Sequence, residues 1–260
     1  MEYLKKVTEK PDEDILWNIP ERKQGTVNII GGNEKNFRAS VRVAEYLSVK
    51  YPVESALMVL PDALKYTLPP LNNIIFLKST ESGTFANNDE LKETMDVADY
   101  NLLVGDFSKN SATARAVANA CQNAKKPLLL TRDTIDLITE GKLEQILMNE
   151  NLVLLGSLIQ LQKVFRTVYY PKVLLLSQSL IQVADALHKF TLSYPTSIVT
   201  LHSGQVIVAR NGKIIAVPLE KTGYSPLSLW EGELAAKIVA LNLYNPNNFL
   251  KATTMALFLR

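Results

Sequence analysis

The stretch from residue 97 to residue 138 constrains this chain most, because it contains a complete strand–helix–strand unit. A short apolar run at 101–104 is followed by a loop of small and polar residues at 105–110. Apolar residues then recur at helical spacing, and a second apolar run follows Pro127. Two strands joined in this way lie parallel in a sheet that is covered by helices.

The loops after these two strands are where we expect a ligand, because ligands of open α/β sheets bind beyond the carboxyl ends of the strands. Gly105 and Asp106 follow the first strand, and Arg132 and Asp133 follow the second. A hydroxyl of Ser111 or Thr113 is expected to cap the intervening helix by accepting from a free N–H group of its first turn.

Composition narrows the class of protein. Of the 260 residues, 47% are hydrophobic, which is enough for a large core, and α/β chains of this length often form one domain. The 28 Lys and Arg residues nearly balance the 26 Asp and Glu residues. The net charge of +2 therefore gives no reason to expect nucleic acid or a membrane as the partner.

Cysteine and histidine content excludes several kinds of site. Cys121 is the only cysteine, so no intrachain disulfide forms, and a reduced, cytoplasmic setting is expected. It lies on the apolar face of a predicted helix, where we interpret it as core packing. His188 and His202 are too few to build a structural zinc site with it. No signal peptide or membrane span is expected, since no run approaches the roughly 20 apolar residues that a span needs.

The rest of the chain continues the alternation of strands and helices. Residues 1–23 are predicted to be an extended arm in which Pro11 and Pro20 interrupt any helix. Residues 24–260 are predicted to be one domain. Its expected strands are 26–30, 55–60, 74–77, 101–104, 128–130, 152–155, 197–201, 205–209 and 213–217. Its further helices are expected at 37–49, 89–97, 141–148, 158–165, 177–190, 231–244 and from 246 or 247 to 257.

This order predicts an α/β fold of three αβα layers with a mainly parallel central sheet. Asn211-Gly212 is a strong hairpin signal and predicts an antiparallel hairpin at the edge of the sheet.

The order of the segments also resembles the ribokinase-like superfamily, and within it the ADP- or ATP-dependent NAD(P)H-hydrate dehydratases of the YjeF C-terminal family. The resemblance covers nearly the whole chain from about Asn18. It is carried by IPERK before VNIIGGN, VGDFSKNSAT, PLLLTRDTIDLI, NLVLLGSLIQLQKVF, SIVTLHSGQVIVARNGKII and SPLSLWEGELAAKIVAL. It implies a ribokinase-like fold, ADP or ATP with Mg²⁺ as cofactor, a nucleotide or NAD(P)H-derived ligand, and a homo-oligomer.

Most motif residues of that family are replaced here. The family has a GTGD loop in which glycine N–H groups at a helix N-terminus hold phosphate and an Asp supplies acid or base. The Asp position aligns with Gly232, preceded by Trp230 and flanked by Glu231 and Glu233. Either glutamate is a candidate displaced catalytic carboxylate, and the alternative is that both simply favour the helix dipole.

Further replacements occur in the loops. Ser157 stands at the His of the family's TPHPGE segment, and His202 at the glycine of its Lys-Gly pair. Arg38 replaces the glycine of a Gly-Ala pair near the first helix. In the GPGLG loop only Gly105 matches, and Phe107 is expected to hinder the close backbone approach that glycine permits.

The resemblance implies a set of site residues. The catalytic candidates are Glu231 and Glu233, and no metal ligand is predicted. The expected cofactor-binding residues are Gly105, Asp106, Asp133, Ser157, His202, Gly204 and Gly232. Ordinary roles stay open beside these: loop and cap residues for the two aspartates, a hydrogen-bonded turn residue for His202, and packing for Trp230.

Two functions remain. Joint loss of the Asp, the paired glycines, the His and the Lys favours a pseudoenzyme with a binding or assembly role, because oriented charges and donors supply most of the catalysis. The alternative is an active lyase that repairs hydrated NADH or NADPH, or a related small-molecule kinase, with a displaced carboxylate. The shape of the predicted cleft distinguishes two cases. If Phe107, Leu158 and Trp230 fill the cleft, the nucleotide sites are closed. If the cleft is open with polar walls, it can bind a divergent ligand.

Overall fold

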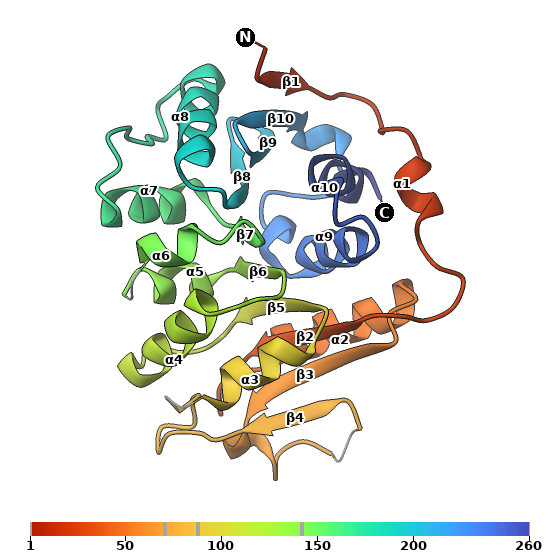
Figure 1. Ribbon diagram of the computed structural model, residues 1–260, viewed down its shortest axis with the longest axis vertical. Helices are drawn as coiled ribbons and strands as arrows, with labels where there is room; N and C mark the ends of the chain where they lie inside the picture. The colour runs from red at the N-terminus through yellow and green to blue at the C-terminus, as the bar shows by residue number, and fades with distance from the viewer. Residues whose placement is uncertain (1, 70–71, 87–88, 141–142, 260) are drawn as a thin grey trace.

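Figure 1 shows the computed structural model, which describes residues 2–69, 72–86, 89–140 and 143–259. One sheet of 10 strands runs through the molecule in the order β1-β10-β9-β8-β7-β6-β5-β2-β3-β4, with helices on both faces. The predicted three-layer α/β fold is thus confirmed. The strands are β1 Leu4–Lys6, β2 Thr26–Gly31, β3 Ser55–Pro61, β4 Ile74–Leu77, β5 Tyr100–Gly105, β6 Leu128–Thr131, β7 Leu152–Leu155, β8 Ser197–His202, β9 Gln205–Arg210 and β10 Lys213–Pro218.

The sheet is mainly parallel, as predicted. Every pair from β4 across to β8 is parallel, whereas β8–β9 and β9–β10 are antiparallel. The predicted hairpin therefore exists near one edge of the sheet. Asn211 and Gly212 at its turn have φ values of 48° and 73°. Positive φ at both central residues is what a type I′ hairpin turn requires, and Asn-Gly tolerates it.

The predicted arm at 1–23 is only partly extended chain. Strand β1 pairs in parallel with β10, with Leu4 opposite Ile214, and forms the outermost strand of that edge. A one-turn helix, α1 Asp14–Trp17, then lies between the two prolines and buries Ile15. The extended chain that was predicted is therefore interrupted at α1 by one helical turn, whereas β1 is extended chain that pairs with the sheet.

Helices form two layers around two hydrophobic cores (Figure 1). One face of the sheet carries α3 to α8, and the other carries α2, α9 and α10 with α1 beside them. Leu103 faces the first core and its neighbour Leu102 the second, since successive side chains of a strand point to opposite faces. The helices are α2 Arg38–Lys50, α3 Glu90–Val97, α4 Ser111–Gln122, α5 Asp133–Ile138, α6 Leu143–Leu147, α7 Leu158–Thr167, α8 Leu180–Ser193, α9 Glu233–Tyr244 and α10 Phe249–Phe258.

Several helix boundaries differ from the prediction. Asn110, not Ser111 or Thr113, caps α4: its side-chain oxygen accepts from the N–H of Ala112 at 2.8 Å. The Thr113 hydroxyl is buried and donates to the carbonyl of Phe85 instead. The predicted helix at 141–148 is described only from Leu143, and its first two residues lie outside the described residues.

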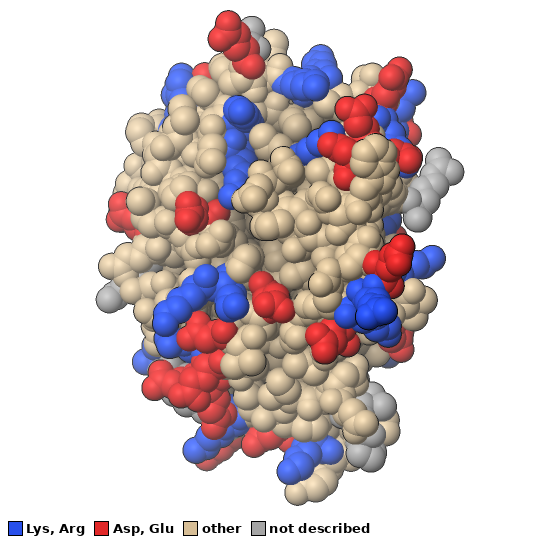
Figure 2. Space-filling model, turned by 45° about the vertical axis from the view of Figure 1, so that its right-hand side comes forward, with Lys and Arg blue, Asp and Glu red and all other residues tan. Residues whose placement is uncertain are grey.

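Charges of both signs are interspersed over the face that Figure 2 shows. No helix in the described ranges is both long enough and apolar enough to cross a membrane. Nor do three or more His, Cys, Asp or Glu side chains gather closely enough, among those residues, to hold a metal ion.

Candidate functional site

The loops after β2 and β5 meet at the carboxyl ends of these neighbouring strands. The N–H of Gly32 donates to the carbonyl of Gly105 at 2.9 Å, and the side-chain amide of Asn33 donates to the carbonyl of Asp106. A Cβ atom on Gly31 would lie 2.4 Å from the Gly105 oxygen. Glycine is needed there because only a residue without a side chain allows the two backbones to approach so closely.

The predicted residues Gly105, Asp106 and Asp133 do come together. The Asp133 carboxylate accepts from the backbone N–H groups of Asp106 at 2.8 Å and Phe107 at 3.2 Å. Arg132 makes a two-pronged ion pair with the Asp106 carboxylate, at 2.7 and 3.3 Å. The two backbone N–H groups of this loop are therefore already bound within the chain.

The loops after β5 and β6 have a strained backbone. Asp106, Ser108 and Arg132 have φ values of 62°, 65° and 57°. Positive φ is uncommon in residues other than glycine and is found where the surroundings hold it in place. Here the Asp106–Arg132 ion pair and the hydrogen bonds to the Asp133 carboxylate stabilise these conformations.

Phe107 does not obstruct the cleft, so the expectation that it would hinder approach to a ligand was wrong. Its side chain is fully buried on the α3–α8 side of the sheet, with its ring centre 5.5 Å from that of Phe85. Leu158 is also in that core. Sequence order alone does not reveal on which side of the sheet a loop side chain packs.

Helix α9 begins at Glu233, two residues later than predicted. A 3₁₀ turn at Ser228–Trp230 leads to Gly232, which is the N-cap with a φ of 103°. A Cβ there would lie 2.6 Å from a methyl carbon of Val43, so close packing against α2 also favours glycine. The N-cap offers no side-chain oxygen to the first turn of α9.

The two candidate catalytic glutamates point to different partners. Glu231 forms an ion pair with Arg42 of α2 at 3.1 Å, and both side chains are more than half exposed. Glu233 forms an ion pair with the buried Lys237 at 3.0 Å and hydrogen-bonds to Tyr46. Burial and, after it, this carboxylate raise the pKa of Tyr46 to about 12.

An open pocket of about 560 Å³ lies between the loop after β5, the first turns of α2 and the segment before α9. Glu231 and Asp106 line it, whereas Glu233 does not. The full lining is Asn36, Arg38, Ala39, Arg42, Asp106, Arg132, Leu227, Trp230 and Glu231. The cleft is therefore open with polar walls, and Trp230 is one wall of it.

Sequence reasoning missed Arg38 and Arg42 of this pocket as functional candidates, whereas it placed Arg132 in a loop expected to border a site. Arg42 and Arg132 are each paired with an acid, but Arg38 has no ion-pair or hydrogen-bond partner within the described residues. The spacing of Arg38 and Arg42, one helical turn apart, was the available signal. The signal for Arg132 was its place directly after β6, which pairs in parallel with β5.

The other predicted site residues lie outside that pocket. Ser157 caps α7 in a capping box with Gln160: its hydroxyl accepts from the N–H of Gln160 at 3.3 Å, and the Gln160 side chain accepts from the N–H of Ser157. Nε2 of His202 is 2.7 Å from the carbonyl of Gln178 and 3.0 Å from the Ser203 hydroxyl. Gly204 forms the β8–β9 turn with a φ of 70°. Cofactor binding by these residues stays a prediction.

No family model matches this sequence, and no curated protein matches it. Solved structures do resemble the fold. A ribokinase-like superfamily protein from Enterococcus faecalis is 13% identical, with a TM-score of 0.65, over 99% of this chain and 86% of that one. An ADP/ATP-dependent NAD(P)H-hydrate dehydratase from Bacillus subtilis is 14% identical, with a TM-score of 0.57, over 96% and 87%. An adenosine kinase from Anopheles gambiae is 11% identical, with a TM-score of 0.52, over 98% and 90%.

The chain therefore has the ribokinase-like fold. At these identities the likeness extends to the fold alone, and this fold hosts different activities.

Proposed function

We propose that this chain is a ribokinase-like protein that has lost turnover and serves as a binding or assembly protein. The observation that carries the proposal is the engagement of both acids at the start of α9. Glu231 is paired with Arg42, and Glu233 with Lys237. A general base must reach the proton that it removes, and both carboxylates are already engaged by cations of this chain.

The phosphate-binding features expected from the resemblance also fit poorly. The N–H groups of Asp106 and Phe107 are bound by the Asp133 carboxylate. Glu231 and Glu233 place negative charge at the N-terminus of α9, where a phosphate would otherwise be attracted. The residues present do not match the expected ADP or ATP arrangement with Mg²⁺, and we derive no catalytic step through it.

A binding role is supported by the open pocket. Three arginines, the indole of Trp230 and about 560 Å³ of space suit a small acidic molecule with a flat ring, such as a nucleotide or an NAD(P)H-derived compound. Arg38 is the arginine that such a ligand reaches without breaking an existing ion pair.

The alternative is an active enzyme of the same fold, either a lyase acting on hydrated NADH or NADPH or a small-molecule kinase. One observation favours it: Glu231 lines the pocket, and its ion pair with Arg42 is exposed to water. Exposed ion pairs are weak, so a ligand phosphate could take Arg42 and release the carboxylate.

Calorimetric titration with ADP and with ATP, each with Mg²⁺, tests these functions when it is followed by an absorbance assay for NADH recovered from hydrated NADH. We expect binding without recovered NADH. Recovery of NADH would overturn the proposal, and loss of that activity in Glu231→Gln, but not in the exposed Glu220→Gln, would assign the displaced carboxylate.

Absence of heat with either nucleotide would exclude nucleotide binding and leave assembly as the proposed role. The resemblance also implies a homo-oligomer, which analytical ultracentrifugation would detect. If the nucleotides do bind, Trp230→Ala is expected to weaken their binding at least fivefold, because stacking on a base is worth about 1–3 kcal/mol.

A further inference from the structure

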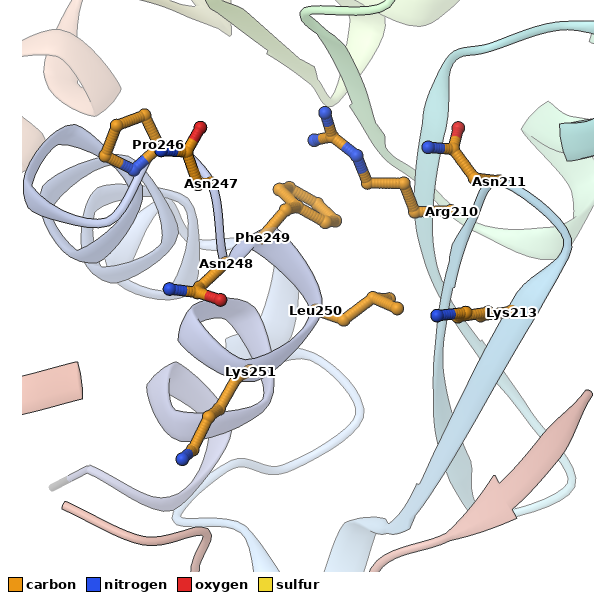
Figure 3. A pocket seen from close by; sticks show the side chains of 9 residues that line it. All are labelled: Arg210, Asn211, Lys213, Pro246, Asn247, Asn248, Phe249, Leu250 and Lys251. Carbon is orange, nitrogen blue, oxygen red and sulfur yellow. The ribbon is translucent and has the colours of Figure 1, made fainter. Parts of the chain in front are cut away.

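A second pocket lies at the opposite ends of the strands from the candidate site. It has a volume of about 470 Å³ and lies between the β9–β10 hairpin and the start of α10 (Figure 3). Arg210 ends β9 next to the amino end of β8, whereas Gly105 and Arg132 follow the carboxyl ends of β5 and β6. The lining residues are Arg210, Asn211, Lys213, Pro246, Asn247, Asn248, Phe249, Leu250 and Lys251.

Arg210 is the unusual residue of this pocket. Its guanidinium carbon lies 4.9 Å from the ring centre of Phe249, and Figure 3 shows the head group directed into the gap. No acidic side chain within the described ranges forms an ion pair with it. Burial lowers the pKa of this guanidinium, and electrostatic interactions with Tyr100 and Glu150 oppose the shift. A half-buried cation without a counter-ion is unfavourable, and a bound anion would relieve this.

Other hydrogen-bond donors face the same space. The side-chain nitrogens of Asn211 and Lys213 come from the hairpin side in Figure 3. The N-terminus of α10 comes from the other side. Its first helical hydrogen bond runs from Ala252 to the carbonyl of Asn248, and the Asn248 side chain provides no cap. The preceding N–H groups of the first turn therefore have no acceptor in the helix. Lys251 also lines the pocket, but its charge is not available to a ligand because it is already paired with Asp14 and Asp12.

An adjoining pocket shares Pro246 with the first, has a volume of about 510 Å³ and is lined in part by Asn242. The Asn242 side chain is only 6% exposed, and its Oδ1 has no hydrogen-bond partner. Its amide nitrogen donates to the carbonyl of Ile238 and the hydroxyl of Thr253, which fixes the orientation of the amide.

We infer that the pocket beside Arg210 forms a binding site for a small phosphorylated molecule, with its phosphate on Arg210 and Lys213. The guanidinium offers a planar fork that matches phosphate oxygens, and the N–H groups of α10 add aligned donors. The site is separate from the pocket beside Trp230, so it does not depend on the proposed function.

Phosphate binding can be tested on the whole chain by following the thermal midpoint and the calorimetric heat with inorganic phosphate and with pyrophosphate. Potassium chloride at matched ionic strength is the reference. We expect the phosphates to raise the midpoint above that reference. Arg210→Met keeps an apolar stem against Phe249 but removes the charge, and we expect it to weaken phosphate at least tenfold. Lys213→Ala, which leaves the Phe249 contact intact, is expected to weaken it several-fold.

Two control variants locate the effect. Arg42→Met removes an arginine of the other pocket, and Lys65→Ala removes an exposed lysine after β3, near the opposite edge of the sheet. Lys65→Ala is expected to bind phosphate as the unaltered chain does, and Arg42→Met is expected to keep the part of the binding that Arg210→Met removes. The inference is overturned if chloride matches the effect of phosphate, if phosphate binds Arg210→Met with unchanged affinity, or if Arg42→Met alone abolishes binding.

Discussion

Lys237 shows how one residue can join several elements. Its side chain is 2% exposed, yet its ammonium donates to the carbonyl of Leu259 at 2.7 Å and pairs with Glu233. The rings of Tyr224 and Tyr46 lie 4.9 and 5.9 Å from the same nitrogen. A buried lysine is tolerated only when it is paired and hydrogen-bonded in this way.

Replacing Lys237 is therefore expected to destabilise the fold. Lys237→Ala loses the contact with Leu259 and leaves a cavity, which should lower the free energy of unfolding by about 2–4 kcal/mol. Lys237→Met keeps most of the volume and should cost about half as much. Urea unfolding measures both, with the exposed Lys50→Ala as control, and an unchanged midpoint for Lys237→Ala would contradict the stated role of its ammonium.

Cys121 is inert for a different reason. It is fully buried in α4, and burial raises the pKa of its thiol to about 12. The thiolate is the reactive form, so at pH 8 a thiol reagent should not modify the folded protein, whereas one thiol per chain should react in urea. Rapid modification of the folded chain would mean that α4 opens far more readily than its packing implies.

At the scale of elements, capping explains one residue that sequence comparison assigned to a site. Ser157 and Ser179 form the same capping box, Ser157 with Gln160 at α7 and Ser179 with Gln182 at α8. The pattern S-x-x-Q before an apolar helix is readable from sequence alone. The position of the Ser157 cap near the candidate site, in contrast, follows from the fold: Gln160 also donates to the carbonyl of Arg132.

The matched pair separates the two roles of Ser157. Ser157→Ala and Ser179→Ala should each lower the free energy of unfolding by about 1 kcal/mol, because each removes an N-cap acceptor. If the chain binds a nucleotide and Ser157 acts only as a cap, neither substitution changes the calorimetric affinity. Weaker binding in Ser157→Ala alone would restore it as a cofactor-binding residue.

At the scale of the whole molecule, one edge of the sheet depends on a segment far away in sequence. The N–H of Ile214 donates to the carbonyl of Tyr3 at 2.7 Å, and that of Val7 donates to the carbonyl of Ala216. The ring of Tyr3 also stacks on His188 with centres 4.0 Å apart. Strand β1 thus covers the hydrogen-bonding edge of β10, and uncovered edges favour aggregation.

Deleting residues 2–7 should lower the thermal midpoint and promote aggregation, since it uncovers β10 and removes the ring that stacks on His188. Lys5→Ala with Lys6→Ala keeps the backbone of β1 and should leave both properties nearly unchanged. Differential scanning calorimetry with light scattering measures the two effects. Equal behaviour of the deletion and the parent would show that the β1–β10 pairing contributes little.

The sequence by itself determined the regular elements and their order. Apolar runs gave β4 and β7 with their observed bounds, and Asn211-Gly212 gave the hairpin, because hydrophobic periodicity and turn chemistry act over a few residues. It also brought Asp106 and Asp133 to one edge, since parallel strands place successive carboxyl ends side by side. Only tertiary structure decided that β1 pairs with β10, that Phe107 packs in the core, and that three arginines surround one pocket. Those outcomes depend on contacts between residues distant in sequence, which no local pattern encodes.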